Sequence, residues 1–347
     1  MEFTILHEFP AARLEAAWHD CLDRVECPAH YDAPEFFLEP FWAGRGPFAV
    51  LALDGDAVTG VLTGLHEGEQ VNAGLPSRPQ ICVDATRDQP AVLDALARGL
   101  LQESGRAKLV SVYTWPSLTL ETFERFRFRL RKLEGDVVLD LTQGPSALFK
   151  QFTHERRKNI RRAIKEGVEV SQATSDEEVS EAYEVYDKWR LTTRKQIKLD
   201  ATPYPVFQRM HRLRNNRRLF VARYAGKIVA CTAFRFFPRG LLEASENFSL
   251  DEFLHVRPND LVYWRAIEWA CQEGFRRHSL GGAHLFHRKA GGTIVPIYRY
   301  RLDRTWLRRH DRMETLRDLG RAAVRKAPPP VEKAVRRLLG REKRIGW

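Results

Sequence analysis

Two segments of this chain share one pattern, and this internal repeat constrains the fold more than any other feature. Residues 48–62 form two β-rich runs around an Asp-Gly-Asp turn, and residues 219–234 form two more around a second glycine. The glycines, Gly55 and Gly226, lie 171 positions apart. Each can supply the positive φ that a tight hairpin turn requires. Because a helical pattern also precedes each hairpin, the sequence predicts two similar halves.

The second copy continues in an order typical of an α/β fold. A strand over 241–249 follows the hairpin. The next helix starts at Asn259 or Asp260, either of which can cap it, and Gly274 suits its end. Short strands follow, the last of them over 293–302. Helix, hairpin, strand, helix and strand around a mixed sheet is the order of the GNAT acyltransferase fold.

Three stretches of the second half carry motifs of a known family. The run 149–170 has the basic opening, and 258–282 the tail, of a characteristic second domain. The run 287–292, His-Arg-Lys-Ala-Gly-Gly, looks like a shortened Phe-Lys…Phe-Gly element. In these motifs the chain resembles FemAB-like proteins and the related CelD-type acyltransferases. The resemblance extends over about residues 30–302 and is strongest over 149–300.

That resemblance implies an α/β protein with two tandem GNAT domains, each with a mixed central sheet. The first would comprise 1–145 and be completed by the strand at 293–302, and the second would comprise 146–292. A basic helical extension would follow at 303–347. The family includes peptidyltransferases that move an amino acid from aminoacyl-tRNA onto a peptidoglycan precursor. It also includes acyltransferases tied to exopolysaccharide and envelope pathways.

The net charge of +11 is distributed unevenly along the chain. Residues 1–149 contain 13 Lys+Arg and 22 Asp+Glu, whereas residues 150–347 contain 43 and 23. The excess is concentrated in 150–165, in 188–218 and in the tail from 304 to 347. Such clusters indicate a polyanionic partner. We expect a phosphorylated or lipid-linked glycan acceptor, leave tRNA open as a second partner, and expect no DNA partner.

Four residues are candidates for binding the substrate. Helical periodicity places Arg157 and Arg161 on one face of a basic helix, where guanidinium groups could hold phosphates. The alternative is a solvated basic face. Arg194 resembles a family arginine that contacts the phosphates of a nucleotide-linked acceptor, and its alternative is a surface salt bridge. Asn259, at the start of the central helix, is the fourth candidate.

Three residues are candidates for catalysis. By the family resemblance, Lys289 lies near the acyl donor, where an ammonium group could stabilise the oxyanion of a tetrahedral intermediate. Glu246 and His287 are candidates for the general base that takes a proton from the nucleophile, and each could instead be an ordinary hydrogen-bonded polar residue. His284 lies three positions before His287, but no third ligand is evident, so we expect no metal site.

The sequence leaves the acyl donor open. GNAT enzymes usually bind the pyrophosphate of CoA with a glycine-containing loop at the start of the central helix. Here that segment, 255–260, contains no glycine, and Asp260 would repel phosphate if it faced inward. However, no coiled-coil arm for tRNA is visible, which favours a thioester donor. We expect no bound cofactor, and acyl-CoA or aminoacyl-tRNA as the co-substrate.

Two functions therefore compete. The first is transfer of an acyl or aminoacyl group to an amine or hydroxyl of a cell-envelope polysaccharide or glycoconjugate precursor, including transfer from aminoacyl-tRNA to peptidoglycan precursors. The second is a GNAT module without catalytic activity that binds RNA or a membrane through its basic half.

Compartment signals are consistent with a cytoplasmic protein. The five cysteines are an odd number without CxxC spacing, which argues against disulfides and zinc. The first residues lack the pattern of a signal peptide, and charged residues interrupt the best apolar window, 48–65. In 331–347 an apolar stripe lies beside basic residues, so this tail could contact the inner face of the membrane. Docking onto the body, or disorder, are the alternatives.

Overall fold

The computed structural model describes residues 1–42, 44–75, 78–116, 118, 121–192, 201–212 and 216–326. The elements of the first half are β1 (Glu2–Leu6), α1 (Ala12–Asp23), β2 (Pro47–Asp54), β3 (Ala57–Glu67), β4 (Gln70–Ala73), β5 (Ile81–Val83), α2 (Gln89–Ser104), β6 (Leu109–Thr114) and α3 (Glu121–Arg125). Short 3-10 helices η1 (His30–Asp32), η2 (Pro34–Leu38) and η3 (Pro40–Trp42) lie between α1 and β2.

The second half repeats this order with additional helices at its start. Its elements are α4 (Gly144–Gln151), α5 (His154–Lys165), β8 (Glu169–Gln172), α6 (Asp176–Thr192), α7 (Tyr204–Arg212), β9 (Arg217–Tyr224), β10 (Lys227–Phe236), β11 (Leu241–Ser249), η5 (Asp251–Val256), α8 (Pro258–Gln272), β12 (Arg277–Ser279) and α9 (Leu285–Arg288).

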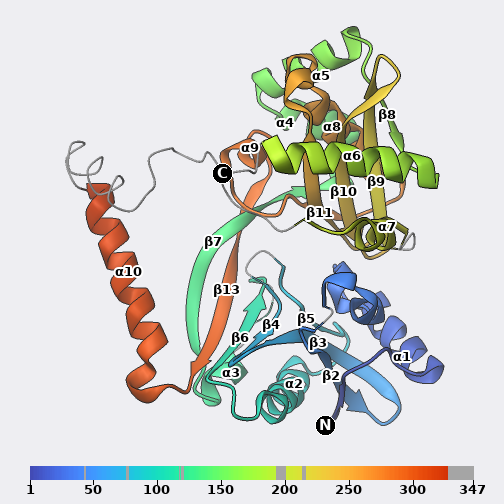
Figure 1. Cartoon of the computed structure of the whole chain (residues 1–347). Helices are drawn as coiled ribbons and strands as arrows, with labels where there is room; N and C mark the ends of the chain where they lie inside the picture. The colour runs from blue at the N-terminus through green and yellow to red at the C-terminus, as the bar shows by residue number, and fades with distance from the viewer. Residues whose placement is uncertain are drawn as a thin grey trace.

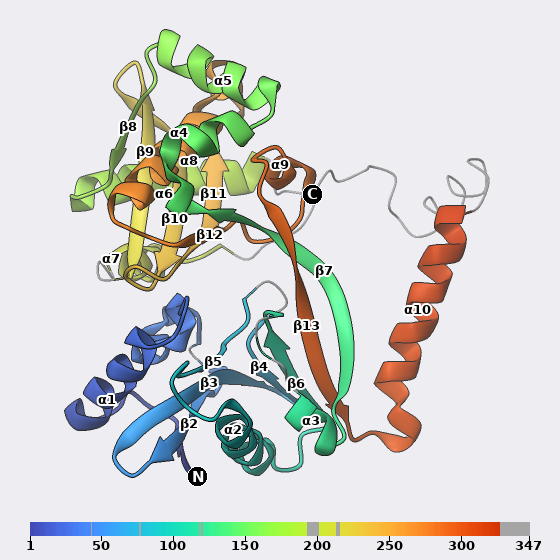
Figure 2. The same cartoon turned by 180° about the vertical axis from the view of Figure 1, so that it is seen from behind.

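Two long strands, β7 (Arg129–Asp140) and β13 (Thr293–Asp303), join the halves (Figure 1). All strands belong to one 13-stranded sheet with the order β1-β2-β3-β4-β6-β13-β7-β12-β11-β10-β9-β8, and β5 pairs with β3. The strand expected at 293–302 is β13, which pairs with β6 and β7. β7 also pairs with β12 of the second half. The two expected central sheets are therefore continuous (Figure 2).

Both predicted hairpins are present. Asp54 pairs with Ala57 across a two-residue turn in which Gly55 has φ 59°. Tyr224 pairs with Lys227 across a turn in which Ala225 and Gly226 both have positive φ. Two-residue turns with these backbone angles follow the right-handed twist of the strands.

Helices bury an apolar core on the faces of the sheet. In the first half, α2 packs Leu96 and Leu100 against strands β2 and β3, and α1 packs Trp18 on the other face. In the second half, α8 packs Val262 and Ile267 against β9 and β10. The apolar periodicity of each helix thus fixes which of its faces lies on the sheet.

The C-terminal part of the described chain lies beside the β7–β13 ribbon. After β13 come η6 (Trp306–Arg308) and α10 (Arg309–Lys326), which stands apart from both halves in Figure 1. The proposed membrane tail 331–347 lies outside the described residues. Within the described ranges, no helix has the length and hydropathy needed to cross a membrane.

Candidate active site between the two halves

Strands β11 and β12 run parallel but soon part. They pair only from Leu241 to Glu243 on β11, whereas the opposite edge of β11 stays paired with β10 as far as Ser249. In the described part of the chain, no strand pairs with the β12-side edge of β11 beyond Glu243. Backbone N–H and C=O groups along 244–249 therefore lack ladder partners on that edge, which is the side an extended ligand could use.

A β-bulge lies where the strands part. Phe234 of β10 is opposite Ala244 and Ala233 is opposite Glu246, so Ser245 has no opposite residue. Its hydroxyl donates to the Ala233 carbonyl at 3.1 Å. Because a bulge turns backbone groups out of the regular ladder, bulges often lie beside active sites. The bulge therefore interrupts the regular β10–β11 ladder just beyond the point where β12 stops pairing with β11.

Side chains of both halves meet in a mostly buried charged group, here called the junction cluster, of which Arg78 and Glu246 are partly exposed. From the first half come His30, Tyr31, Glu39 and Arg78, and from the second half His211, Asn216, Arg217, Arg235, Glu243 and Glu246. Arg217 forms an ion pair with Glu39, which also lies 3.2 Å from His30 Nε2. Arg235 donates to the Tyr31 hydroxyl, and its guanidinium lies 4.7 Å from that ring's centroid. These contacts hold the two halves together.

The junction cluster contains many buried polar atoms that have no protein partner. They include Arg217 Nε, both side-chain polar atoms of Asn216, Arg235 Nε and Nη2, and Glu243 Oε2. Arg217, Arg235 and Glu243 are each only 2% exposed. Buried polar atoms are normally hydrogen-bonded, so a group of unpartnered ones indicates a place for a polar ligand or ordered water.

The two glutamates of β11 differ in acidity. Burial raises the pKa of Glu243, and the nearby charges of Arg235 and Arg78 only partly oppose this effect. For Glu246, burial also acts upward, but the His211 imidazole, 3.7 Å away, holds the net pKa below the usual value. The site therefore offers one carboxyl that gains a proton easily and one that stays ionised.

Another buried carboxyl lies on β7, beside the end of β12. Asp136 accepts hydrogen bonds from the Ser279 hydroxyl and, at 2.6 Å, from the Gly282 N–H. His287 is close by, with Nδ1 at 2.9 Å from the Gly282 carbonyl oxygen. Burial lowers the pKa of His287, which favours the neutral imidazole. Asp136 thus fixes the loop that carries His287.

A cavity of about 460 Å³ lies between the halves on the side of β5. Its walls are mainly apolar, with Ile81 and Trp115 from the first half and Leu241 from the second. Asp32 also lines it, with Oδ1 buried and unpartnered, and burial raises its pKa to about 7. Asp32 directly follows Tyr31 of the junction cluster in the sequence, so the cavity lies beside that cluster.

The two predicted basic residues of α5 make local contacts, and their role in binding substrate stays a prediction. Arg157 donates to the carbonyl oxygens of Lys150 and Phe152, at 2.7 and 2.6 Å, and so closes the end of α4. Arg161 is exposed, with its guanidinium 5.6 Å from the Phe149 ring centroid. Arg194 lies outside the described residues.

The start of α8 differs from the expected cap. The capping residue is Arg257, at φ 59°, not Asn259 or Asp260, and Pro258 occupies the first helical position. Pro258 has no N–H, so a side-chain cap would find fewer donors there. Asn259 instead donates to Ser249 Oγ at 2.9 Å, and its Oδ1 is buried and unpartnered. The predicted helix end at Gly274, with φ 77°, is correct.

Arg156 is a buried residue near the start of α8 whose environment sequence reasoning missed. It is 2% exposed, lies 3.4 Å from Asp260 Oδ1, and is surrounded by the rings of Phe152, Tyr263 and Phe286. Asp260 also accepts from Asn159 at 2.9 Å. A signal existed, because Arg156 lies one turn before the buried Ile160.

Lys289 lies at the same end of α8. Its ammonium is 2.8 Å from the exposed Glu155 carboxylate, and its charge reaches Asp260. The structure thus groups Lys289 with the start of α8, His287 with Asp136, and Glu246 with the junction cluster. Among the described residues no group of His, Cys, Asp and Glu is arranged to hold a metal ion.

Comparisons with known proteins concern the same elements. Residues 154–289 match the family model described as an acetyltransferase (GNAT) domain. FemX has a TM-score of 0.65 at 12% identity, covering 87% of this chain and 98% of its own. The C-terminal domain of a protein named putative lysylphosphatidylglycerol synthetase, from Agrobacterium fabrum, has a TM-score of 0.59 at 14% identity, covering 89% and 96%.

A tandem GNAT protein from the clavulanic acid biosynthesis pathway has a TM-score of 0.52 at 13% identity, covering 88% of this chain and 99% of its own. No curated protein matches the chain in sequence. At these identities the likeness to solved structures concerns the fold.

Proposed function

Because the chain has the tandem GNAT fold of FemAB-like proteins, we propose that it is an acyltransferase whose reaction takes place where β11 and β12 part. One observation carries the proposal. Three features lie together in the structure: the bulge at Ser245, the end of the β11–β12 pairing at Glu243, and the polar atoms of the junction cluster that lack hydrogen-bond partners among the described residues.

The donor carbonyl would lie against the bulge. Acyl transfer passes through a tetrahedral intermediate with a negatively charged oxygen, which fixed N–H donors stabilise. The N–H groups around Ser245 would be such donors, since the bulge interrupts the regular ladder with β10 there. The donor chain would then extend along the unpaired edge of 244–249, towards the start of α8.

The start of α8 favours aminoacyl-tRNA over acyl-CoA as the donor. A helix N-terminus binds pyrophosphate through free N–H groups. Here Pro258 has none, and the Asp260 carboxylate lies in the first turn, held by Arg156 and Asn159. Lys289 lies beside this turn, where its ammonium could contact a single backbone phosphate of tRNA. We give this geometry more weight than the sequence pattern, in which no coiled-coil arm is visible and which favoured a thioester.

The acceptor would occupy the junction cluster. Arg217 and Arg235 have unpartnered N–H groups suited to a phosphate, and guanidinium groups bind phosphate strongly. Glu246 stays ionised and could orient an ammonium or hydroxyl. These groups fit a phosphorylated cell-envelope precursor that carries an amine or hydroxyl. The Agrobacterium relative is named for lysylphosphatidylglycerol. In that compound a lysyl group is joined to a phosphate-containing envelope molecule, as it would be after transfer to an acceptor of this kind.

Glu243 would act as the general base. Its carboxyl lies at the last paired position of β11 and β12, with Oε2 unpartnered, and burial raises its pKa, which makes it a stronger base than an ordinary carboxylate. It would take the proton of the acceptor nucleophile as the new bond to the acyl carbon forms. The acyl group would then leave the tRNA ribose oxygen, which takes up a proton.

Thermal protection by different donors tests this proposal. A ligand that binds only the native state raises the unfolding temperature to an extent set by its affinity and concentration. We expect protection by aminoacyl-tRNA that exceeds that by uncharged tRNA, and little protection by acetyl-CoA. Protection by acyl-CoA alone would make a thioester the donor. If neither protects and any RNA stabilises the chain in a salt-dependent way, the protein is a non-catalytic binding module.

A further inference from the structure

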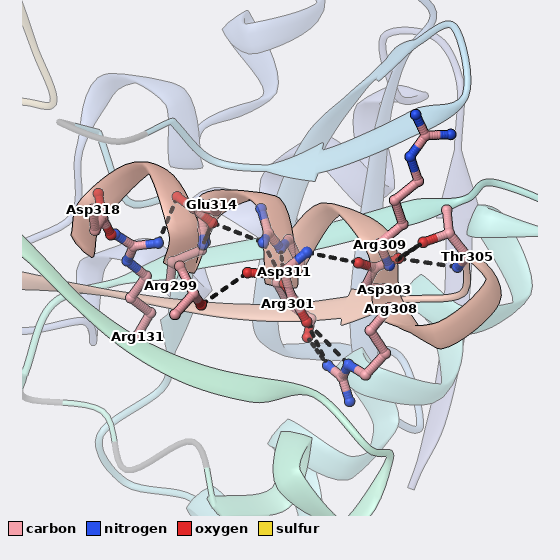
Figure 3. Close-up of polar contacts among 11 residues, drawn as sticks. Arg131, Arg299, Arg301, Asp303, Thr305, Arg308, Arg309, Asp311, Glu314 and Asp318 are labelled. Carbon is pink, nitrogen blue, oxygen red and sulfur yellow. Dashed lines mark hydrogen bonds and ion pairs between the residues drawn. The ribbon is translucent and has the colours of Figure 1, made fainter. Parts of the chain in front are cut away.

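Helix α10 is attached to the body through one acidic face. Asp311, Glu314 and Asp318 point at arginines of the β7–β13 ribbon (Figure 3). Glu314 lies 2.7 Å from Arg131 and 2.6 Å from Arg299. Other contacts join Asp318 to Arg131 and Asp311 to Arg301 and Arg308. The attachment is an ion-pair network, not an apolar interface.

Because the ion pairs use the acidic face of α10, they determine which residues lie on its opposite, outer face. Residues 304–326 contain eight Lys and Arg, and their acidic residues are Asp311, Glu314 and Asp318, which all belong to the attached face. At 100° per residue, Arg309, Met313 and Leu316 lie opposite the acidic face. Met313 is 44% exposed and Leu316 61% exposed. The outer face is therefore apolar and bordered by arginine, and among the described residues nothing covers it.

The turn before α10 adds an exposed aromatic residue. Trp306 in η6 is 84% exposed, and Leu307, at φ 50°, is half exposed. A positive φ at leucine is unfavourable, so the surrounding structure must hold this turn in place. Tryptophan beside arginine is a combination that is favoured at the boundary between lipid headgroups and acyl chains.

We propose that the outer face of α10, together with Trp306, binds an anionic membrane surface. Apolar side chains alone would also fit a second copy of the chain, but two such faces would bring like charges together. A surface rich in phosphatidylglycerol complements the arginines and accepts the apolar residues. The chain beyond 326 continues with 6 Lys+Arg and 2 Asp+Glu, so it adds attraction of the same sign.

Vesicle sedimentation with the full chain tests this inference. The vesicles are phosphatidylcholine alone, or phosphatidylcholine and phosphatidylglycerol in equal parts. We expect binding to the anionic vesicles only, with release at high salt. Replacing the two apolar residues together (Met313→Glu, Leu316→Glu) should weaken binding about tenfold or more. The matched control Leu254→Glu, at an exposed leucine of η5, should change it less than about twofold.

Two results would overturn the inference. One is equal binding of wild type and the double variant, with both shown by circular dichroism to be folded. The other is a concentration-dependent dimer in sedimentation velocity that the double variant abolishes, since the face would then bind a second copy. Neither result depends on the identity of the acyl donor.

Discussion

Glu243 and Ser279 lie opposite each other at the last position where the parallel strands β11 and β12 pair, and both side chains are buried. Beyond this pair β11 continues towards the bulge with β10 on one edge and, among the described residues, no partner strand on the other. The Ser279 hydroxyl donates to Asp136, whereas Glu243 belongs to the junction cluster and its Oε2 is unpartnered. The candidate reaction site therefore begins at this pair of residues, where the pairing of β11 with β12 ends.

We expect Glu243→Gln to reduce kcat by roughly a hundredfold or more, because general-base catalysis contributes that amount. The free energy of unfolding at pH 7 should stay unchanged or increase, since the substitution removes an acid whose ionised form is disfavoured by burial. Single-turnover kinetics and urea unfolding measure the two effects. Glu252→Gln, at an exposed glutamate, is the matched control. A Glu243→Gln variant that keeps the wild-type kcat would show that Glu243 takes no part in catalysis.

The pH dependence of kcat should report the same group. Glu243 must be ionised to accept a proton, and burial raises its pKa, so activity should increase with pH above the usual titration range of a carboxyl. Glu243→Gln should abolish this rising limb while lowering the plateau. If the increase of kcat with pH persists unchanged in the variant, a group other than Glu243 is responsible for it.

The ion pair of Glu39 and Arg217 should contribute strongly to stability. Glu39→Gln leaves the Arg217 guanidinium buried without its counter-charge, which costs about 3–5 kcal/mol. Despite burial, the nearby Arg217 and His30 hold the pKa of Glu39 below its usual value, so its contribution is present at neutral pH and lost as the pH falls through the acid range.

Urea unfolding at neutral and acid pH checks both the size and the sign of this effect. The control is Glu26→Gln, which removes an exposed ion pair with Arg277 and should cost less than about 1 kcal/mol. Equal effects of the two substitutions would show that the buried pair does not hold the halves together.

For Lys289→Ala we expect the KM for the donor to increase about tenfold with little change in kcat, because its ammonium lies beside the start of α8. Steady-state kinetics separate the two constants. Lys158→Ala, at an exposed lysine of α5, is the control. A large loss of kcat at constant KM would instead support stabilisation of the oxyanion by Lys289.

The backbone framework could be predicted from the sequence because its signals are local. Gly55 and Gly226 mark the two hairpins, and Gly274 marks the end of α8. The start of α8 was predicted incorrectly, since a positive φ at Arg257 has no clear sequence signal. The domain boundaries stay a prediction.

The site was harder to predict because its members are distant in sequence. Glu39 and Arg217 are 178 positions apart and meet only when the ribbon of β7 and β13 brings the halves together. One hint was present, since Arg235 interrupts an apolar strand pattern over 227–236. Of the residues proposed for catalysis, Glu246 lies in the junction cluster, and no observation yet tests its role or those of His287 and Lys289.

Hydrogen–deuterium exchange of the backbone amides in 244–249 tests the central claim most directly. The full chain would be measured alone and with aminoacyl-tRNA, uncharged tRNA or acetyl-CoA. If the donor lies along the unpaired edge of β11, aminoacyl-tRNA should slow exchange in this segment more than uncharged tRNA does, and acetyl-CoA should have little effect. Exchange in 244–249 that no donor changes, while amides elsewhere become protected, would contradict acyl transfer at the parting of β11 and β12.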